Sequence, residues 1–118
     1  MKKTKFSKKE IKEFSNLLKK KRKKNTEELK SINSIISDQK KYIAESDMNF
    51  SSDASKIRDK EMLKRMRTRM VRKDKRYNDA LDRIKLGTYG RDIRSGKMIS
   101  KDRLLVKPEA TRSIMKKK

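Results

Sequence analysis

The chain has 118 residues, of which 38 are lysine or arginine and 16 are aspartate or glutamate, giving a formal net charge of +22. Hydrophobic residues make up 31% of the chain and aromatic residues 5%, which excludes the large apolar core of an ordinary globular enzyme. We therefore expect a helical protein, because an amphipathic helix buries only one stripe of side chains. We also expect a polyanionic partner, with nucleic acid first, because so strong a positive charge attracts phosphates.

The absence of certain residue types excludes several kinds of site and reaction. The chain contains no cysteine and no histidine, which excludes disulfides, thiolate zinc sites and imidazole catalysis. It has no glycine-rich phosphate loop and no convincing carboxylate pair. We expect no enzyme, no cofactor, no metal and no small-molecule substrate. The basic N-terminal residues are not followed by an apolar segment, so we expect no secretion signal, no membrane partner and a cytoplasmic location.

Residues 1–6 are predicted to be a basic tail that precedes a first long helix. Ser7 and Glu10 have the spacing of a capping box, in which each side chain accepts a hydrogen bond from the other residue's backbone amide. Asn25 follows a run of six basic residues and can cap a second helix, so one continuous helix and two helices with a hinge are both compatible with the sequence. Apolar residues recur at helical spacing as far as Glu45, at Ile11, Phe14, Leu18, Leu29, Ile32, Ile36 and Ile43.

A polar turn is predicted near residues 46–53, and a second long helix is predicted from Ala54 to Leu86, capped by Ser51, Ser52 or Asp53. The apolar residues of this helix alternate by three and four positions, which is typical of a coiled-coil seam. They are Leu63, Met66, Met70, Tyr77, Leu81 and Ile84. We expect residues 7–86 to form a long antiparallel helical hairpin.

The basic clusters of the two helices form the candidate binding site. If the hairpin turns near residue 49, the run 19–24 lies opposite residues 75–80. Like charges placed side by side destabilise a helix pair, and a phosphate backbone would neutralise them. The residues predicted to contact phosphates are Lys19, Lys20, Lys21, Arg22, Lys23, Lys24, Arg65, Arg67, Arg69, Arg72, Lys73, Lys75, Arg76, Arg91 and Arg94.

Residues 87–118 are predicted to form a small knot that ends in a basic tail. Gly87 is placed to end the second helix in a left-handed conformation, and Gly96 is placed in a tight turn. Pro108 is predicted to open a short last helix, with Glu109 in its first turn. The apolar residues expected to hold the knot together are Ile93, Met98, Ile99, Leu104, Leu105, Val106 and Ile114.

The stretch ALDRIKLGTYG at residues 80–90, together with GKMISKDRLLVKPEAT at residues 96–111, resembles the C-terminal part of the DksA/TraR family. The resemblance implies a mainly α fold, in which a coiled-coil hairpin carries a small finger. In that family, four cysteines hold a zinc ion in the finger. The matching positions here hold Asp92, Ser95, Ser113 and Lys116, so we expect a finger-like knot without zinc.

The resemblance also implies a role for the turn between the two helices. In family members that act on RNA polymerase, the hairpin enters the secondary channel and presents acidic residues there. The matching positions in this chain hold Asn49, Ser52 and Ala54, so both acids are lost, although Asp47 and Asp53 flank them.

Two functions remain open from the sequence. The charge favours a non-catalytic RNA-binding protein, most simply a ribosomal or ribosome-associated protein that contacts rRNA phosphates, with ribosomal proteins as further partners. The resemblance favours a bacterial transcription regulator that binds in the secondary channel of RNA polymerase. The first function predicts binding that weakens steeply with salt and ignores Asp53. The second predicts binding that survives moderate salt and activity that depends on Asp53.

Overall fold

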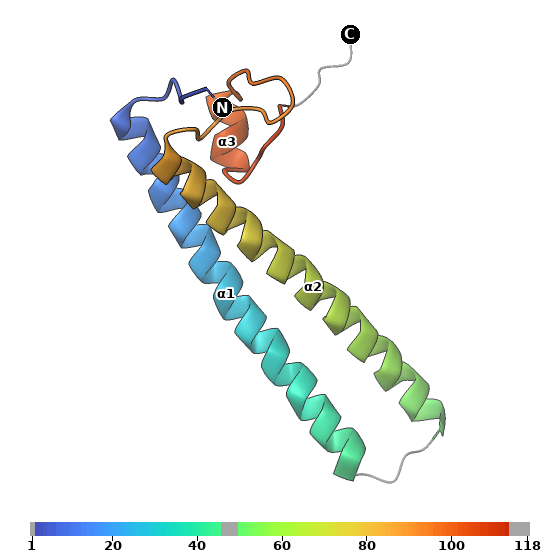
Figure 1. Ribbon diagram of the computed structural model, residues 1–118. Coiled ribbons are helices and arrows are strands. Elements are labelled where there is room, and N and C mark those ends of the chain that lie inside the picture. The colour runs from blue at the N-terminus through green and yellow to red at the C-terminus, as the bar shows by residue number, and fades with distance from the viewer. Residues whose placement is uncertain (1, 46–49, 114–118) are drawn as a thin grey trace. The chain divides into compact units, whose positions relative to one another are not determined.

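The computed structural model describes residues 2–45 and 50–113, with the side chains of residues 2–38 and 58–113. Its helices are α1 (Lys8–Glu45), α2 (Phe50–Leu86) and α3 (Lys101–Val106), as Figure 1 shows. The predicted mainly α class is confirmed. The chain divides into two compact units, which we name the terminal unit (residues 1–23 and 75–118) and the central unit (residues 24–74).

Helix α1 begins at the predicted capping box. The Ser7 amide donates to Glu10 Oε1 at 3.0 Å, and the Glu10 amide donates to Ser7 Oγ at 3.1 Å. The helix continues through Asn25 without interruption, which excludes the predicted alternative of two helices with a hinge. Asn25 does not cap a helix because its side chain is buried and its amide nitrogen Nδ2 donates to the Met70 carbonyl oxygen at 2.9 Å.

Helix α2 begins at Phe50, four residues before the predicted start at Ala54, so that the predicted caps 51–53 lie inside its first turn. Small polar and acidic residues suit this position because the first turn carries free amides and the positive end of the helix dipole. The helix ends as predicted, with Gly87 at a φ of 77°. The Gly87 amide donates to the Ile84 carbonyl at 3.2 Å and the Thr88 amide to the Arg83 carbonyl at 3.0 Å, which is the Schellman arrangement.

The terminal unit contains one continuous apolar core. Phe14 lies at its centre, fully buried, with ring centroids 5.1 Å from Phe6 and 5.3 Å from Tyr89. The Tyr89 hydroxyl donates to the Pro108 carbonyl at 2.7 Å. The other buried residues of this core come from both long helices and from the C-terminal segment: Leu18, Tyr77, Ala80, Ile99, Leu104 and Ala110.

The N-terminal residues, which the sequence analysis describes only as a basic tail, contribute to this core. The Thr4 amide donates to the Gly87 carbonyl at 2.8 Å. The Phe6 ring packs so closely on Gly90, which has a φ of 86°, that a Cβ at position 90 would collide with it. These contacts pin residues 3–6 to the start of the C-terminal segment.

Helix α3 ends before Pro108, so the prediction that Pro108 opens the last helix is wrong. Ser100 caps α3 instead, because its Oγ accepts a hydrogen bond from the Arg103 amide at 3.3 Å. The Lys107 amide closes the last turn on the Arg103 carbonyl at 2.8 Å. Pro108 has no amide hydrogen with which to extend the helix, and its ring is buried against the core.

The residues that hold the knot together are also only partly those predicted. Ile99 and Leu104 are buried as expected. Ile93, Leu105 and Val106 are 49%, 46% and 74% exposed, respectively, because Tyr89, Pro108 and Ala110 fill the interior in their place. Ile114 lies outside the described residues.

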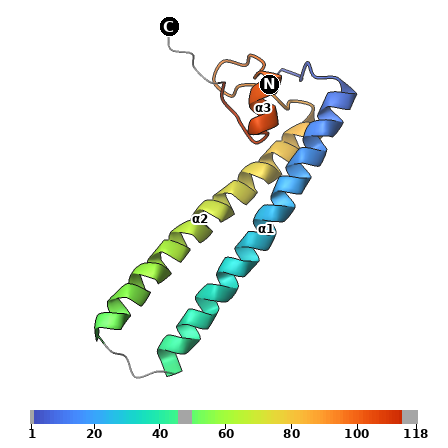
Figure 2. The ribbon, with the colours of Figure 1, turned by 180° about the vertical axis from the view of Figure 1, so that it is seen from behind.

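In the central unit, the described parts of α1 and α2 run antiparallel and side by side, as the two views in Figures 1 and 2 agree. Ile32 and Ile36 of α1 are buried, and Leu63, Met66 and Met70 of α2 are half-buried. The hydrogen bond from Asn25 to Met70 sets a register close to the one predicted. The seam is therefore narrow, with one stripe of each helix against the other.

Candidate nucleic-acid interface

The predicted basic cluster of α1 is divided between solvent and the protein itself. Lys19, Lys20, Lys23 and Lys24 are exposed. Lys21 Nζ donates to the Val106 carbonyl at 3.0 Å, and Arg22 Nη1 donates to Asn78 Oδ1 at 2.8 Å. These two residues therefore also hold the terminal unit together.

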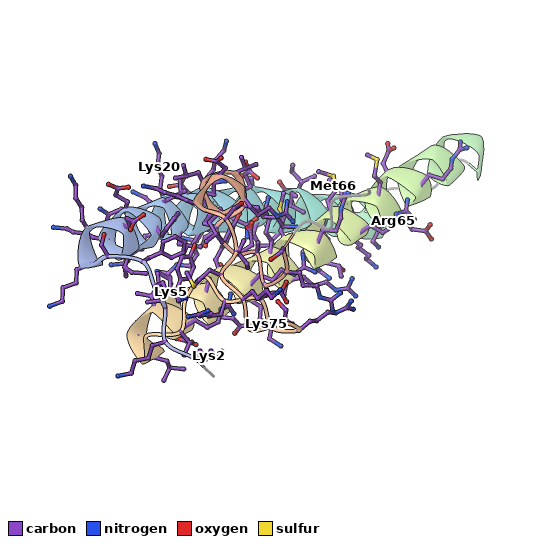
Figure 3. The ribbon with its side chains drawn as sticks, turned by 90° about the horizontal axis from the view of Figure 1, so that it is seen from above. Lys2, Lys5, Lys20, Arg65, Met66 and Lys75 are labelled. Atoms are coloured by element: carbon purple, nitrogen blue, oxygen red, sulfur yellow. The ribbon has the colours of Figure 1, made fainter. Side chains whose placement is uncertain are left out.

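The two predicted basic residues of α2 that belong to the terminal unit are open to solvent. Lys75 and Arg76 are exposed. In Figure 3 the Lys75 side chain, like that of Lys20 on α1, projects away from the ribbon. These lysines are free to meet a polyanion from outside the helix pair, since each points outward rather than toward the facing helix.

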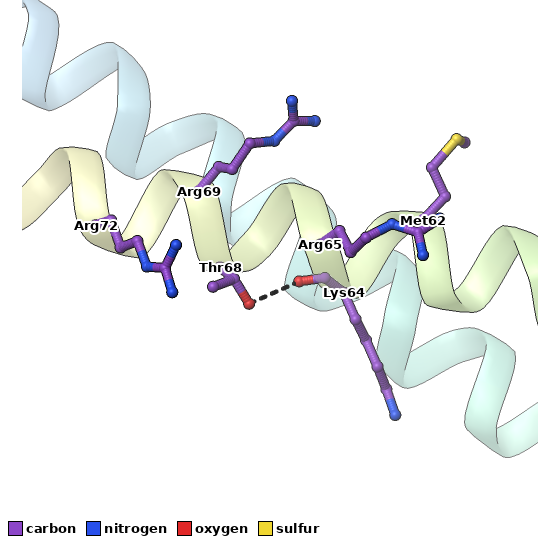
Figure 4. A pocket seen from close by; sticks show the side chains of 6 residues that line it. All are labelled: Met62, Lys64, Arg65, Thr68, Arg69 and Arg72. Carbon is purple, nitrogen blue, oxygen red and sulfur yellow. Dashed lines mark hydrogen bonds between the residues drawn. The ribbon is translucent and has the colours of Figure 1, made fainter.

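The predicted arginines of α2 in the central unit surround an open hollow. Arg65, Arg69 and Arg72 are exposed and line it together with Met62, Lys64 and Thr68, as Figure 4 shows. The Thr68 hydroxyl is turned back onto its own helix, where it donates to the Lys64 carbonyl at 3.0 Å. Lys73 is also exposed, and Arg67 is half-buried. None of the described residues that line the hollow is acidic.

Arg91 differs from the other predicted phosphate contacts. It is buried, and its guanidinium donates to the Lys3 carbonyl at 3.1 and 2.9 Å and to the Gly96 carbonyl at 3.0 Å. A guanidinium held by backbone carbonyls in this way serves the fold, so we do not carry Arg91 into the interface. Arg94, three residues on, is exposed.

A second hollow lies in the terminal unit and was not predicted. Its cationic lining comes from Arg76, Arg103, Lys107 and Arg112, with Glu109 among them. Arg103 Nε and Glu109 Oε2 are buried, and neither has a hydrogen-bond partner among the described residues. The signal in the sequence was weak, because these residues are separated by apolar positions and α3 was not predicted.

Asp92 is buried and holds the two halves of the knot together. Its Oδ2 accepts from the Ser113 amide at 2.8 Å, and its Oδ1 accepts from the Arg94 and Ser95 amides at 2.7 and 3.2 Å. The hydrogen bonds from the Ser113 and Arg94 amides lower the pKa of Asp92 to about 2. We call this arrangement the Asp92 clasp.

The residues at the positions of the family's zinc cysteines do not fit zinc. Both oxygens of Asp92 already accept backbone amides, and the serine hydroxyls at 95 and 113 are poor substitutes for thiolate or imidazole. Lys116 lies outside the described residues. Among the described side chains of residues 2–38 and 58–113, no three acidic groups lie together in a way that could hold a metal ion. The Asp92 carboxylate itself links residues 92–95 to residue 113.

The other described groups with clearly shifted pKa values owe the shift to burial or to a local hydrogen bond. Burial raises the pKa of the Tyr89 hydroxyl, which donates to Pro108. Burial lowers the pKa of Arg83, and the hydrogen bond from the Ser7 amide lowers the pKa of Glu10.

The family resemblance also singled out residues at the hairpin turn. Asp47 and Asn49 lie outside the described residues. Ser52, Asp53 and Ala54 fall within α2, but their side chains lie outside the description. No described helix is long and apolar enough to cross a membrane.

Comparison with known proteins identifies the fold. No family model matches the sequence, and no curated protein sequence matches it. The structure of the transcription factor DksA2 from Pseudomonas aeruginosa is similar to this one, with a TM-score of 0.80 and 21% sequence identity. The match covers 91% of this chain and 79% of that chain. The chain therefore has a DksA/TraR-like fold, as the resemblance implied.

Proposed function

We propose that this protein is a transcription regulator that binds RNA polymerase through its helical hairpin and catalyses no reaction itself. The observation that carries the proposal is the fold, which matches that of a transcription factor over 91% of this chain. The match includes the long helices as well as the knot, since α1 and α2 alone contain 38 and 37 residues. Polymerase and its transcripts lie in the cytoplasm, the location that we also propose for this protein.

The local chemistry supports the same proposal. The Asp92 clasp joins the two segments that a metal ion joins in the family, so this chain keeps the finger without the ligands. The seam of the central unit is narrow, and α2 is about 55 Å long at 1.5 Å per residue. A long helix and a seam this narrow suit insertion into a channel.

The direct test is binding to purified bacterial core RNA polymerase by sedimentation, at low and at moderate salt. The expected result is comigration that survives moderate salt, with an effect on transcription from a defined promoter in vitro. The variant Asp53→Ala should lose that effect while Asp59→Ala, which removes an exposed acid from the same helix, should keep it. Absence of comigration with polymerase at both salt concentrations would exclude the proposal.

A second candidate function is binding to RNA, with ribosomal RNA as the expected target. The observation that favours it is the open hollow lined by Arg65, Arg69 and Arg72, in which no described lining residue is acidic. Sedimentation of a cell lysate separates the two functions. A protein that travels with a ribosomal subunit at low salt and leaves it at high salt binds rRNA through its charge. A protein that travels with RNA polymerase at both salt concentrations has polymerase, and not rRNA, as its partner.

A further inference from the structure

Four arginines of the central unit share one face of α2. Arg58, Arg65, Arg69 and Arg72 follow one another at intervals of seven, four and three residues. With 3.6 residues per turn, these positions fall within about 60° of one another around the helix axis. All four side chains are exposed. We call this surface the arginine face.

The two helices of the central unit carry very different charges. The segment of α1 from residue 24 to 45 contains four basic and four acidic residues, whereas the segment of α2 from residue 50 to 74 contains nine basic and four acidic residues, with no acid between residues 62 and 73. The type of cation differs too. Helix α1 has eleven lysines and one arginine, and α2 has six lysines and seven arginines.

This preference for arginine points to a ligand. Lysine is sufficient to make a helix soluble, but the planar guanidinium donates two parallel hydrogen bonds to a phosphate and loses less entropy for each bond. The arginines have no such partner within the part of the protein that the structure describes, where Arg58, Arg65, Arg69 and Arg72 make no side-chain hydrogen bond or ion pair. Like charges at these spacings repel and destabilise the helix.

We propose that the arginine face binds the sugar–phosphate backbone of nucleic acid, laid along α2. From Arg58 to Arg72 the helix rises about 21 Å. One strand of a duplex places about six phosphates over that length, at 3.4 Å per residue. A protein partner would be expected to meet an aromatic or apolar centre, whereas Met62 is the one apolar residue among the described residues that line the hollow. The inference names the surface for the second candidate function and does not depend on polymerase binding.

The test compares two triple variants of the full-length protein that lose the same charge. The first is Arg65→Gln, Arg69→Gln and Arg72→Gln. The control is Lys12→Gln, Lys30→Gln and Lys85→Gln, which removes three exposed cations from elsewhere on the long helices. Binding to labelled 20-nucleotide single-stranded RNA, and to 20-base-pair RNA and DNA duplexes, is measured by fluorescence anisotropy over a range of KCl concentrations. Circular dichroism checks that both variants keep the helix content of the wild type.

The slope of log affinity against log salt gives the number of phosphate contacts. Losing three contacts should lower that slope by about 2 to 3 for the arginine variant, while the control should lower it by less than 1. A third variant carries Arg65→Lys, Arg69→Lys and Arg72→Lys. It should recover most of the slope but less of the affinity, because it keeps the charge and loses the paired hydrogen-bond donors of the guanidinium.

Each other result overturns the inference in a distinguishable way. If the wild type binds none of the three probes, the second candidate function itself fails. If the arginine variant and the control weaken equally, binding follows net charge and no surface is special. If the arginine variant keeps its RNA and DNA affinity but loses polymerase, this face is a protein-docking surface.

Discussion

The terminal and central units use the same two helices in different ways. In the terminal unit, α1 and α2 pack against a third layer of chain, and Phe14, Tyr89 and Leu104 share a closed aromatic and aliphatic core. In the central unit, the described parts of α1 and α2 pack against each other, and their described buried residues are Asn25, Ile32 and Ile36. The terminal unit therefore buries its apolar side chains more completely, because a further segment of the chain closes the core there.

This difference separates stability from binding. A fully buried side chain contributes free energy of folding that an exposed one does not, so the terminal unit should carry most of the stability. The exposed arginines of the central unit repel one another in the free protein and are useful only to a partner. Substitutions that compare the two units test this division.

The largest effect should follow from removing the centre of the terminal core. Phe14→Ala deletes a fully buried ring and should lower the free energy of unfolding by about 3–5 kcal/mol, measured by urea denaturation with circular dichroism. The matched change in the central unit is Val71→Ala, at a side chain that is 52% exposed, and it should change stability by no more than about 0.5 kcal/mol. Equal losses from the two variants would refute the division.

A second comparison uses two glycines with left-handed backbones in the terminal unit. Gly87 and Gly90 have φ values of 77° and 86°, so alanine at either position should cost about 1 kcal/mol in backbone strain. A Cβ at Gly87 meets open space, whereas one at Gly90 meets the Phe6 ring. Gly90→Ala should therefore cost clearly more than Gly87→Ala in the same urea experiment. If the two costs are equal, residues 3–6 are not part of the core.

A smaller effect is expected at the polar residue in the central seam. Asn25→Ala removes the hydrogen bond to the Met70 carbonyl and should cost about 1 kcal/mol. Asn25→Leu places an apolar side chain in a coiled-coil seam and should match or exceed the wild type in stability, since a buried asparagine fixes register at a cost in stability. If Asn25→Leu lowers the stability as much as Asn25→Ala does, the hydrogen bond stabilises the protein as well as fixing the register of the two helices.

Local sequence signals predicted the two long helices well, but not α3. The capping box of Ser7 and Glu10 and the left-handed Gly87 depend on residues no more than a few positions apart, and both are found as predicted. The continuity of α1 through Asn25 was left open, because a residue that can cap a helix can equally lie inside one. Only the contact with Met70, 45 residues away, decides between them.

Contacts between distant parts of the chain explain what the sequence did not show. Arg91 was predicted to contact phosphates because its charge is visible in the sequence, but its guanidinium meets the carbonyl of Lys3, 88 residues away. Phe6 stands alone among lysines, and nothing local indicates that Gly90 receives its ring. Asp92 was noted only as the position of a lost zinc ligand, since its bond to the Ser113 amide depends on the folded knot.

In this protein a carboxylate, that of Asp92, joins the segments of the knot, whereas a metal ion joins them in the family that the sequence resembles. The pKa of Asp92 in the folded protein, about 2, is below its ordinary value of 3.8. The ionised clasp therefore stabilises the fold fully above about pH 4, and that contribution is lost as the pH falls through 2. The urea midpoint of the wild type should fall over this range, in addition to any change from Glu10, whose pKa is also lowered.

Asp92→Asn isolates the contribution of the carboxylate, because an amide presents one acceptor oxygen where the carboxylate presents two. Its urea midpoint should lie below that of the wild type at pH 7, and the gap should close toward pH 2. Asp102→Asn, which removes an exposed acid from α3, should leave the wild-type profile unchanged. A chelator should not move the midpoint of the wild type, nor should added zinc, since the clasp leaves no carboxylate oxygen free. A midpoint that falls with chelator would show that a metal, rather than Asp92, closes the knot.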